Sequence, residues 1–575
     1  IDSGSTVRTK QYSYNAVGSV LSEGDGVSAY AYQYDNLDRL VSVDNFGTPG
    51  VPHTVLTKQY DALGNVVSTV DSFGYGIQSV YDPRGKLASR EYQSPNSTAR
   101  FDLSYLSTGD RESISRFEDL LAQLQGGSSE LSYDANRRVT GYVHRSDTGT
   151  AISTSDYAYN PGNEVVTESH DGEDSQYSYD ALGQILSAQY QSYPDESFQY
   201  DANGNPIAAG YIIGANNRVL SDPQFDYAYD SDGNLVTKDN RVSEETGYFY
   251  YDHDNRLTKY ELKSSGGATL VLVQYGYDVR GRRISRSVNG TPSYYLYDEE
   301  HVWADFGQAD SGGGANRLAS YVHADTIDEL LAIERSGEGV SYYLTDQLGS
   351  VRSRVNASGS NLHQKFYKAF GGINTQSGTA ERYGFTGREY DSEVGMYYYR
   401  ARMFDPRLGR FISEDPLGFE AGDANLYRYV GNSPANGRDP SGMSIAISYG
   451  QLLGVTAAVL ATQAYTTTRY VASFSPTSPA VLDGVRKSIK QAVQSTFDFA
   501  IIAVDSSKNL GFVKEINTII ALVVGAFELG QVQPYPSELT GEEVKPIPLS
   551  DTLDVTIIQT KKGPCPPCPS NIVQV

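Results

Sequence analysis

Through the first half of the chain, short segments alternate tyrosine with a polar or small residue. In the range 175–179, for example, Tyr177 and Tyr179 are separated by Ser, and in 226–229 Tyr227 and Tyr229 are separated by Ala. This two-residue period is typical of a β-strand, whose successive side chains point to opposite faces. Most of these segments lead into Asp, then Gly or Asn three residues later, then an aliphatic residue such as Leu235. Because Asp and Gly or Asn favour tight turns, each unit is predicted to be a β-hairpin.

The unit recurs along the chain, and most neighbouring copies are roughly 20 to 29 residues apart. The copies are YDNLDRL at Tyr34, YDALGNV at Tyr60, YDPRGKL at Tyr81, YDANRRV at Tyr133, YDALGQI at Tyr179, YDANGNP at Tyr200, YDSDGNL at Tyr229, YDHDNRL at Tyr251 and YDVRGRRI at Tyr277, with degenerate copies at Tyr14 and Tyr159. One hairpin is marginally stable in water, but a row of hairpins can stack into a continuous sheet. The Tyr and Asp of the copies are therefore interpreted as packing and turn residues, not as catalytic groups.

Three ranges carry apolar residues at helical spacing. In 113–124 these residues include Ile114, Phe117 and Leu121, which predicts a short helix inserted between strands. The ranges 481–504 and 513–529 are predicted to be further helices.

The chain changes character after Met443. Of the 46 Tyr, four lie beyond this residue, and no charged residue occurs between Pro440 and Thr468. The apolar stretch 452–461 is interpreted as a buried helix, with insertion into a membrane as the alternative, since about 20 apolar residues span a bilayer. The Pro-rich stretch 534–548 and the Pro-flanked Cys565 and Cys568 are interpreted as linker, with zinc and redox sites as alternatives.

Composition narrows the classes of function. The net charge of −24 disfavours general binding to nucleic acid. With 2 Cys in 575 residues the chain is not a disulfide-stapled scaffold, and 39% hydrophobic residues argue against wholesale disorder. The seven His lack metal-ligand spacing, so neither a metal nor a cofactor is expected. Because the chain begins at Ile1 and its first Met is Met396, it is interpreted as a fragment or a processed product.

The repeats resemble the YD repeats of the RHS family. In addition, residues 342–443 contain YYLTDQLGSVRSRV, YGFTGREYDSEVGMYYYRARMFDPRLGRFISEDPLGF and NLYRYVGNSPANGRDPSGM in that order. This series is similar to the RHS repeat-associated core domain. The resemblance implies a mainly β fold, in which a spiral β-sheet shell of hairpins is closed by the core domain and followed by a small, mainly α region. The implied domains are a partial YD-repeat shell (1–300), the core domain (301–443), a variable helical region (444–533) and a Pro-rich junction to a truncated toxin (534–575).

The resemblance also implies a chemistry, because the core domain of this family cuts its own chain just after a DPxGL motif. Carried over to this sequence, the scissile bond joins Met443 to Ser444, with Met443 in place of the usual Leu. Asp439 and Asp415 are the implied carboxylate pair, and Arg428 is a candidate for orientation or charge stabilisation. One carboxylate would draw a proton from water while the other, protonated, polarises the carbonyl. Cleavage within one chain gains from proximity. No other enzyme activity is indicated.

Three functions are consistent with these features. The first is a fragment of an RHS-type polymorphic toxin, whose shell encloses a C-terminal effector and whose core domain releases it by self-cleavage. The second is a cell-surface or wall-associated YD-repeat protein with a structural or adhesive role and no activity. The third is a membrane-active C-terminal effector that contacts the membrane through 444–468. For the toxin, the expected partners are its own effector segment, an immunity protein and a secretion system, and the expected location is secreted or at the bacterial surface, with delivery into a target cell.

Overall fold

The computed structural model describes residues 9–46, 48–123, 125–308, 316–443 and 446–447, and three further strands at 470–474, 500–504 and 556–559. The chain divides into two compact units, which are described separately. One consists of Ile1–Pro416 with Ala424–Gln451, and the other of Leu417–Asp423 with Leu452–Val575.

Two long antiparallel sheets make up most of the first unit. The first sheet has 17 strands, β1 to β17, and the second sheet has 16 strands, β18 to β33. Strands that follow each other in sequence pair with each other, as in β5 with β6 and β26 with β27. The first sheet contains β1 (Gln11–Tyr14), β2 (Val20–Gly24), β3 (Ala29–Tyr34), β4 (Leu40–Asp44), β5 (Val55–Tyr60), β6 (Val66–Asp71), β7 (Gly76–Tyr81), β8 (Leu87–Gln93), β9 (Thr98–Tyr105), β10 (Arg111–Phe117), β11 (Gln125–Tyr133), β12 (Val139–Arg145), β13 (Ala151–Tyr159), β14 (Val165–His170), β15 (Glu173–Tyr179), β16 (Ile185–Tyr190) and β17 (Glu196–Ser197).

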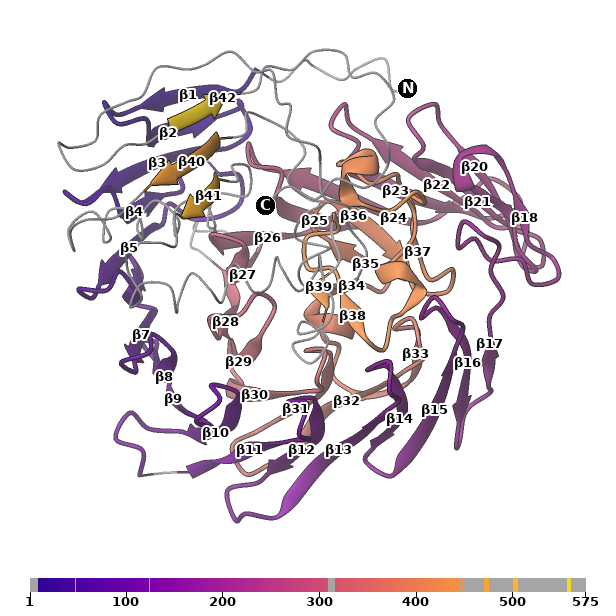
Figure 1. The fold of residues 1–575 in the computed structure, drawn as a ribbon. Coiled ribbons are helices and arrows are strands. Elements are labelled where there is room, and N and C mark those ends of the chain that lie inside the picture. Colours follow the sequence, from indigo (N-terminus) through magenta and orange to yellow (C-terminus); the bar gives the residue numbers. More distant parts are fainter. Residues whose placement is uncertain are drawn as a thin grey trace. The chain divides into compact units, whose positions relative to one another are not determined.

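The second sheet continues the hairpins without a break at the predicted boundary between residues 300 and 301. It contains β18 (Ile212–Ile213), β19 (Val219–Ser221), β20 (Phe225–Tyr229), β21 (Leu235–Asn240), β22 (Thr246–Tyr251), β23 (Leu257–Lys263), β24 (Thr269–Tyr277), β25 (Arg283–Val288), β26 (Thr291–Asp298), β27 (His301–Gly307), β28 (Arg317–His323), β29 (Leu330–Arg335), β30 (Gly339–Thr345), β31 (Val351–Val355), β32 (Asn361–Tyr367) and β33 (Ile373–Gly378). Within the first unit, the two sheets follow each other round a ring (Figure 1).

The Asp of each YD copy organises the turn that follows it. One oxygen of Asp61 accepts hydrogen bonds from the backbone N–H of Leu63 at 2.8 Å and of Asn65 at 2.9 Å, and the other accepts from the Asn65 amide. The residue three positions after the Asp adopts a positive φ, as at Gly64 (87°) and Asn255 (57°). The same pair of backbone bonds recurs at Asp35, Asp82, Asp134, Asp180, Asp201, Asp230, Asp252, Asp278 and Asp346. The predicted turn chemistry is therefore confirmed.

In most copies the Tyr joins its hairpin to the preceding one. The hydroxyl group of Tyr60 donates to the carbonyl of Leu40 at 2.6 Å, and that of Tyr277 donates to Leu257 at the same distance. Equivalent bonds are made by Tyr34, Tyr81, Tyr105, Tyr133, Tyr159, Tyr179, Tyr297 and Tyr367. A buried hydroxyl needs a partner, and these tyrosines find one on the backbone of the neighbouring hairpin.

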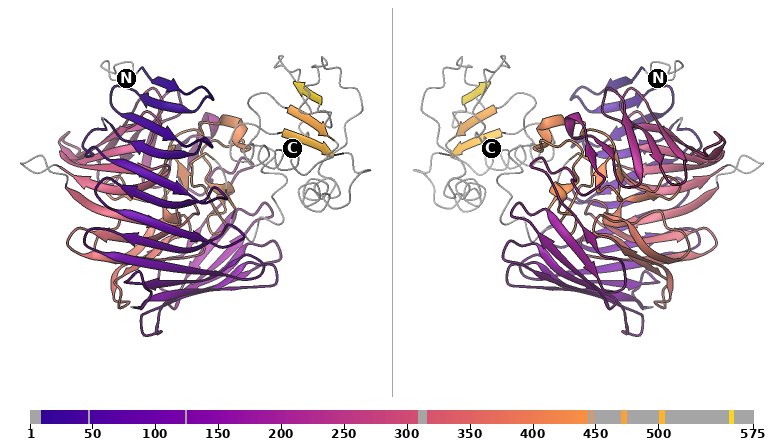
Figure 2. Two further views of the ribbon diagram at one scale, coloured as in Figure 1. Left: turned by 90° about the vertical axis from the view of Figure 1, so that its left-hand side faces the viewer. Right: turned by 90° about the vertical axis from the view of Figure 1, so that its right-hand side faces the viewer.

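The two sheets contact each other along a seam. Trp303 of the second sheet donates its indole N–H to Asp71 of the first sheet at 2.9 Å. Lys58 lies 2.6 Å from Asp298, and the hydroxyl group of Tyr92 donates to Glu334 at 2.5 Å. Side views of the first unit show strands of the two sheets next to each other (Figure 2).

A small four-stranded core sheet follows the second sheet and lies inside the ring (Figure 1). It contains β34 (Glu389–Asp391), β35 (Met396–Tyr399), β36 (Arg402–Asp405) and β37 (Arg410–Phe411). Both faces of β35 are buried, because Tyr397 and Tyr399 belong to one hydrophobic cluster while Met396 and Tyr398 belong to another. The first cluster also includes Ile185 of the first sheet, so the core sheet is anchored to the ring by apolar packing.

The prediction of a mainly β fold is confirmed, but the predicted helix over 113–124 is wrong. Residues 111–117 form β10, which pairs with β9 and β11, and 118–123 form bends and turns. The alternation of Ser113, Ile114, Ser115 and Arg116 gives the strand one buried face, with Ile114 and Arg116 inside. Leu124 lies outside the described residues.

In the second unit, η3 (Gly418–Ala421) is a short 3-10 helix, and the described strands form a three-stranded sheet. β40 (Tyr470–Phe474) pairs in parallel with β41 (Ala500–Val504) and antiparallel with β42 (Thr556–Gln559). β41 corrects the end of the helix predicted over 481–504, since its residues Ala-Ile-Ile-Ala-Val are rich in β-branched side chains. The rest of that helix, the helix predicted over 513–529, the segment 452–461, and Cys565 and Cys568 lie outside the described residues. Among the described residues, no helix has the length and apolar character needed to cross a membrane.

Candidate functional site

The DPSGM loop, residues 439–443, connects two short paired strands. β38 (Gly437–Arg438) precedes it and β39 (Ala446–Ile447) follows it, and the two pair antiparallel. The loop is therefore the connection of a hairpin, and the bond after Met443 lies within that connection. Ser444 lies outside the described residues.

Asp439 is buried and folds the loop around its own carboxylate. One oxygen, Oδ1, accepts hydrogen bonds from the Gly442 N–H at 2.9 Å, the Met443 N–H at 3.2 Å and the Ser441 hydroxyl at 3.0 Å. Accepting three donors suits an ionised carboxylate, which has lone pairs but no proton to give. The carboxylate of Asp439 thus touches the backbone of the residue whose carbonyl would be attacked.

Three consecutive residues at the turn between β35 and β36 hold three consecutive carbonyls of the DPSGM loop. The donors are Arg400 to the Pro440 carbonyl, the Ala401 N–H to the Ser441 carbonyl at 3.2 Å, and Arg402 to the Gly442 carbonyl. These contacts fix the loop up to the peptide before the candidate scissile bond.

Arg402 also brings the two predicted carboxylates together. Its Nη2 lies 2.7 Å from Oδ2 of Asp415 and 3.5 Å from Oδ2 of Asp439. Its Nη1 donates to the Leu426 carbonyl at 2.9 Å, and the guanidinium carbon lies 3.6 Å from the centroid of the Phe411 ring. One positive charge is thereby shared between two buried carboxylates, which lowers the cost of holding both in the core.

Gly442 allows this close packing. Its φ is 71°, and a Cβ built on it would lie 2.2 Å from the Tyr399 carbonyl oxygen. A side chain at this position would be strained and would collide with the backbone of the core sheet.

Of the residues predicted from the sequence, Asp415 and Asp439 meet at one guanidinium. Nη1 of Arg428 donates to the Gln184 side chain at 3.4 Å, and its role in orientation or charge stabilisation stays a prediction. The residue that contacts both carboxylates is Arg402, which sequence reasoning missed. A signal was present, because Arg400 and Arg402 interrupt the otherwise aromatic and apolar run MYYYRARMF.

No metal centre is evident in the part of the chain that the structure describes, where no group of three or more His, Cys, Asp or Glu is placed to hold an ion.

Comparison with known proteins places the fold in a family. A model of the Teneurin YD-shell family matches residues 109–435, more than half of the chain. The chain belongs to this family. The resemblance of the YD repeats to RHS proteins is confirmed with it, because the curated relatives of this YD-shell chain include named toxins.

Two such relatives match most of the chain. Double-stranded DNA deaminase toxin A of Burkholderia cenocepacia (strain H111) is 25% identical over 510 residues, covering 77% of this chain and 34% of that protein. The tRNA3(Ser)-specific nuclease WapA of Bacillus spizizenii is 27% identical over 430 residues, covering 73% of this chain and 16% of that protein. The YD-shell chain therefore spans about a third or less of the length of these relatives.

A solved structure supports the fold alone. The crystal structure of TcdB2-TccC3-Cdc42 matches with a TM-score of 0.50 and 18% identity, covering 76% of this chain and 24% of that chain.

Proposed function

We propose that this YD-shell chain cuts its own backbone between Met443 and Ser444, with Asp439 and Asp415 as the catalytic carboxylates. The observation that carries the proposal is the Arg402 guanidinium, which contacts Asp415 at 2.7 Å, Asp439 at 3.5 Å and the carbonyl of Gly442. A single guanidinium charge leaves one net negative charge on the two carboxylates. A shared proton balances that charge, as aspartyl chemistry requires.

The reaction follows from a pair that holds one proton. The ionised carboxylate takes a proton from a water molecule while the water oxygen bonds to the carbonyl carbon of Met443, and the protonated carboxyl gives its proton to the carbonyl oxygen. The C–N bond then breaks as the first carboxyl protonates the nitrogen of Ser444. A hydroxyl of the intermediate returns its proton to the second carboxyl, which leaves a carboxylic acid on Met443 and restores the pair.

The three contacts from residues 400–402 supply the positioning. Because folding already holds the DPSGM loop against the carboxylates, no further entropy is lost when the reacting groups meet. Each chain needs to react once only.

The proposed biological role is that of an RHS-type toxin piece. The shell would enclose a C-terminal effector, and cleavage after Met443 would separate that effector from the shell. Support comes from the names of the relatives, which include a DNA deaminase toxin and a tRNA nuclease. The proposal includes an immunity protein, a secretion system and delivery of the effector into a target cell.

Mass spectrometry of the chain made in a heterologous host tests the cleavage. The wild type is expected to give pieces 1–443 and 444–575, while Asp439→Asn and Asp415→Asn remain intact. Asp405→Asn is the matched control: Asp405 also precedes Pro and is buried, but its carboxylate lies 2.7 Å from Lys238. This control is expected to be cut like the wild type. An intact wild-type chain would reject the peptidase and favour a structural role at the cell surface.

A further inference from the structure

We propose that Asp328 is a positioning residue that makes self-cleavage depend on docking of the first sheet against the second. The inference rests on the proposed cleavage after Met443. Asp328 lies in the 324–329 loop, between β28 and β29 of the second sheet. It contacts Arg400 directly and acts through that residue.

Asp328 binds Arg400, and Arg400 binds the DPSGM loop. Its Oδ1 lies 2.8 Å from Nη2 of Arg400 and 2.7 Å from Nη1 of Arg388, and its Oδ2 accepts from Arg400 at 3.1 Å. Arg400 in turn donates to the carbonyl of Pro440, next to Asp439. Asp328 is 4% exposed, so these bonds form in a site largely shielded from water, where they are strong.

On its outer side, the same loop is held by the first sheet at both ends. Arg90 of β8 donates to the His323 carbonyl and lies 2.5 Å from Asp325. Arg111 of β10 pairs with Glu329. Asp328 thus lies between two ion pairs that cross the seam.

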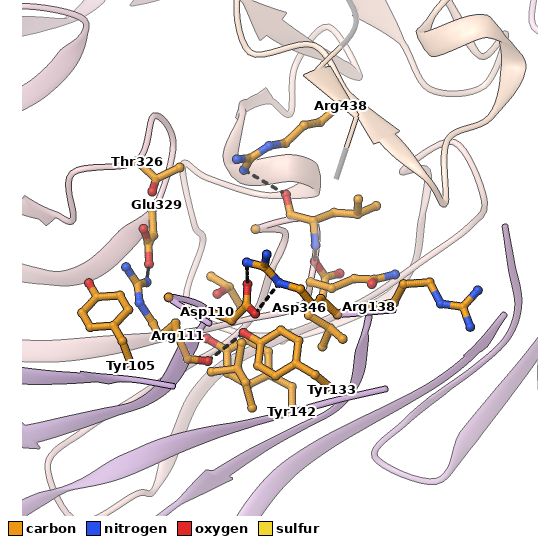
Figure 3. A pocket seen from close by; sticks show the side chains of 18 of the residues that line it. Tyr105, Asp110, Arg111, Tyr133, Arg138, Tyr142, Thr326, Glu329, Asp346 and Arg438 are labelled. Atoms are coloured by element: carbon orange, nitrogen blue, oxygen red, sulfur yellow. Dashed lines mark hydrogen bonds and ion pairs between the residues drawn. The ribbon is translucent and has the colours of Figure 1, made fainter. Parts of the chain in front are cut away.

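A cavity of about 470 Å³ opens at this part of the seam. Arg111, Glu329 and Thr326 line one side of it, and Arg438, the residue before Asp439, lines another (Figure 3). Arg438 reaches the second sheet as well, where its Nη1 lies 3.5 Å from the Leu348 carbonyl. The 324–329 loop, the seam and the residue before the DPSGM loop therefore all line this cavity.

A second turn of the second sheet repeats the arrangement. Lys58 of the first sheet lies 2.9 Å from Glu299, and the next residue, Glu300, lies 3.4 Å from Nε of Arg400. Arg400 therefore contacts two loops of the second sheet, one through Asp328 and the other through Glu300. Cations of the first sheet form ion pairs with both loops. If the first sheet were undocked, Asp325, Glu329 and Glu299 would lose their partners, and the loops that orient Arg400 would be free to shift.

The test compares cleavage rates of full-length variants. Asp328→Asn is expected to slow cleavage about 10- to 100-fold, the loss typical of a small misplacement of reacting groups. Arg90→Ala and Arg111→Ala, which lie on the first sheet, are expected to slow it in the same direction. Combining Arg90→Ala with Asp328→Asn should slow cleavage less than the product of the two single effects. Both changes act on one series of contacts, from Arg90 through the 324–329 loop and Asp328 to Arg400, which we call the relay.

Arg138→Ala is the matched control. Arg138 lines the same cavity, but its guanidinium bonds Asp134 of its own turn at 2.5 Å and Asn160 and Asn163 of the first sheet. This variant is expected to cleave at the wild-type rate. Equal rates for wild type, Asp328→Asn and Arg90→Ala would overturn the relay.

A second readout does not need cleavage. In an Asp415→Asn background, hydrogen exchange of the Ala401 amide, which bonds the Ser441 carbonyl, should speed up on adding Asp328→Asn or Arg90→Ala but not Arg138→Ala. Unchanged exchange would overturn the relay, even if the wild type proved uncleaved and the proposed function failed. Arg400→Lys replaces Asp328→Asn if the latter does not fold, and should also speed exchange.

Discussion

Arg402 carries more of the candidate site than either aspartate. Its planar guanidinium serves Asp415, Asp439, the Leu426 carbonyl and the Gly442 carbonyl at once. Lysine provides one point charge on a flexible stem and cannot form this set of bonds. The positive charge alone is therefore insufficient for the arrangement.

Arg402→Lys is accordingly expected to lower the cleavage rate by about 100-fold, the scale of losing one preorganised donor set. The measurement is a time course of intact mass after synthesis of the full chain. Arg407→Lys is the control, since Arg407 pairs with Asp222 at 2.7 Å, outside the carboxylate site. A wild-type rate in Arg402→Lys would contradict the assigned role.

Asp328 also gives the fold a defined acid sensitivity. Burial on its own would raise the pKa of Asp328, but Arg388 and Arg400 lower it to about 2. A carboxyl whose pKa is lower in the folded than in the unfolded state stabilises the fold above its unfolded pKa. That stabilisation is lost as the pH falls from 3.8 towards 2.

Asp328 is expected to contribute about 2 kcal/mol to the free energy of unfolding across this window. Urea unfolding of wild type and Asp328→Asn between pH 5 and pH 2 measures it. The difference in unfolding free energy between the two should shrink as the pH falls through the window. A difference that stays constant with pH would contradict the assignment.

At the candidate site, sequence reasoning named Asp415 and Asp439 but not Arg402. The pair Asp415 and Asp439 followed from motifs shared with a family. Spacing could not single out Arg402 beside Arg428, because both lie in recurring motifs. Arg402 contacts the DPSGM loop because it begins β36, whose end faces that loop. This placement depends on strand pairing within the core sheet.

At the scale of elements, the hairpins were predictable because each turn carries its own chemistry. Asp61 and its equivalents bond the backbone two and four residues on, and this is a local interaction that a sequence pattern reveals. The range 113–124 shows where such local reading fails. Ile114, Phe117 and Leu121 have helical spacing, but Leu121 is exposed, and pairing with β9 and β11 decides the structure of 111–117.

The DPSGM loop offers a test at this scale through its glycine. Gly442→Ala should abolish or strongly slow cleavage, because the new Cβ would lie 2.2 Å from the Tyr399 carbonyl oxygen. Gly337→Ala is the control: Gly337 has a similar φ of 81°, yet nothing lies within 4 Å of its Cβ position. Comparable cleavage of the two variants by intact mass would contradict the close packing of the loop.

For the molecule as a whole, the seam joins segments more than 200 residues apart in sequence. Trp303 and Arg317 of the second sheet both bond Oδ2 of Asp71 in the first sheet, and Trp303 is the single Trp of the chain. Such pairings lie beyond any local pattern, which is why the repeats predicted the hairpins but not which hairpins meet across the seam.

The indole of Trp303 therefore reports the docking of the two sheets. Asp71→Asn should lower the free energy of unfolding by about 3 kcal/mol, because it leaves the Arg317 cation, whose side chain is 10% exposed, without its carboxylate. It should also shift the Trp emission to longer wavelength at lower denaturant than in the wild type. Asp44→Asn is the control expected to change little, because the Asp44 carboxylate contacts the exposed His53. An unchanged emission profile in Asp71→Asn would argue against the seam.

We propose that Asp439 and Asp415, held together by Arg402, cut the bond after Met443 in their own chain. The most direct measurement follows intact mass and N-terminal sequence of freshly synthesised full-length chain over time. We expect a new N-terminus at Ser444, a first-order rate that does not change on dilution, and no product from Asp439→Asn. A wild-type chain that stays intact, a cut at another bond, or equal cutting of Asp439→Asn would contradict it.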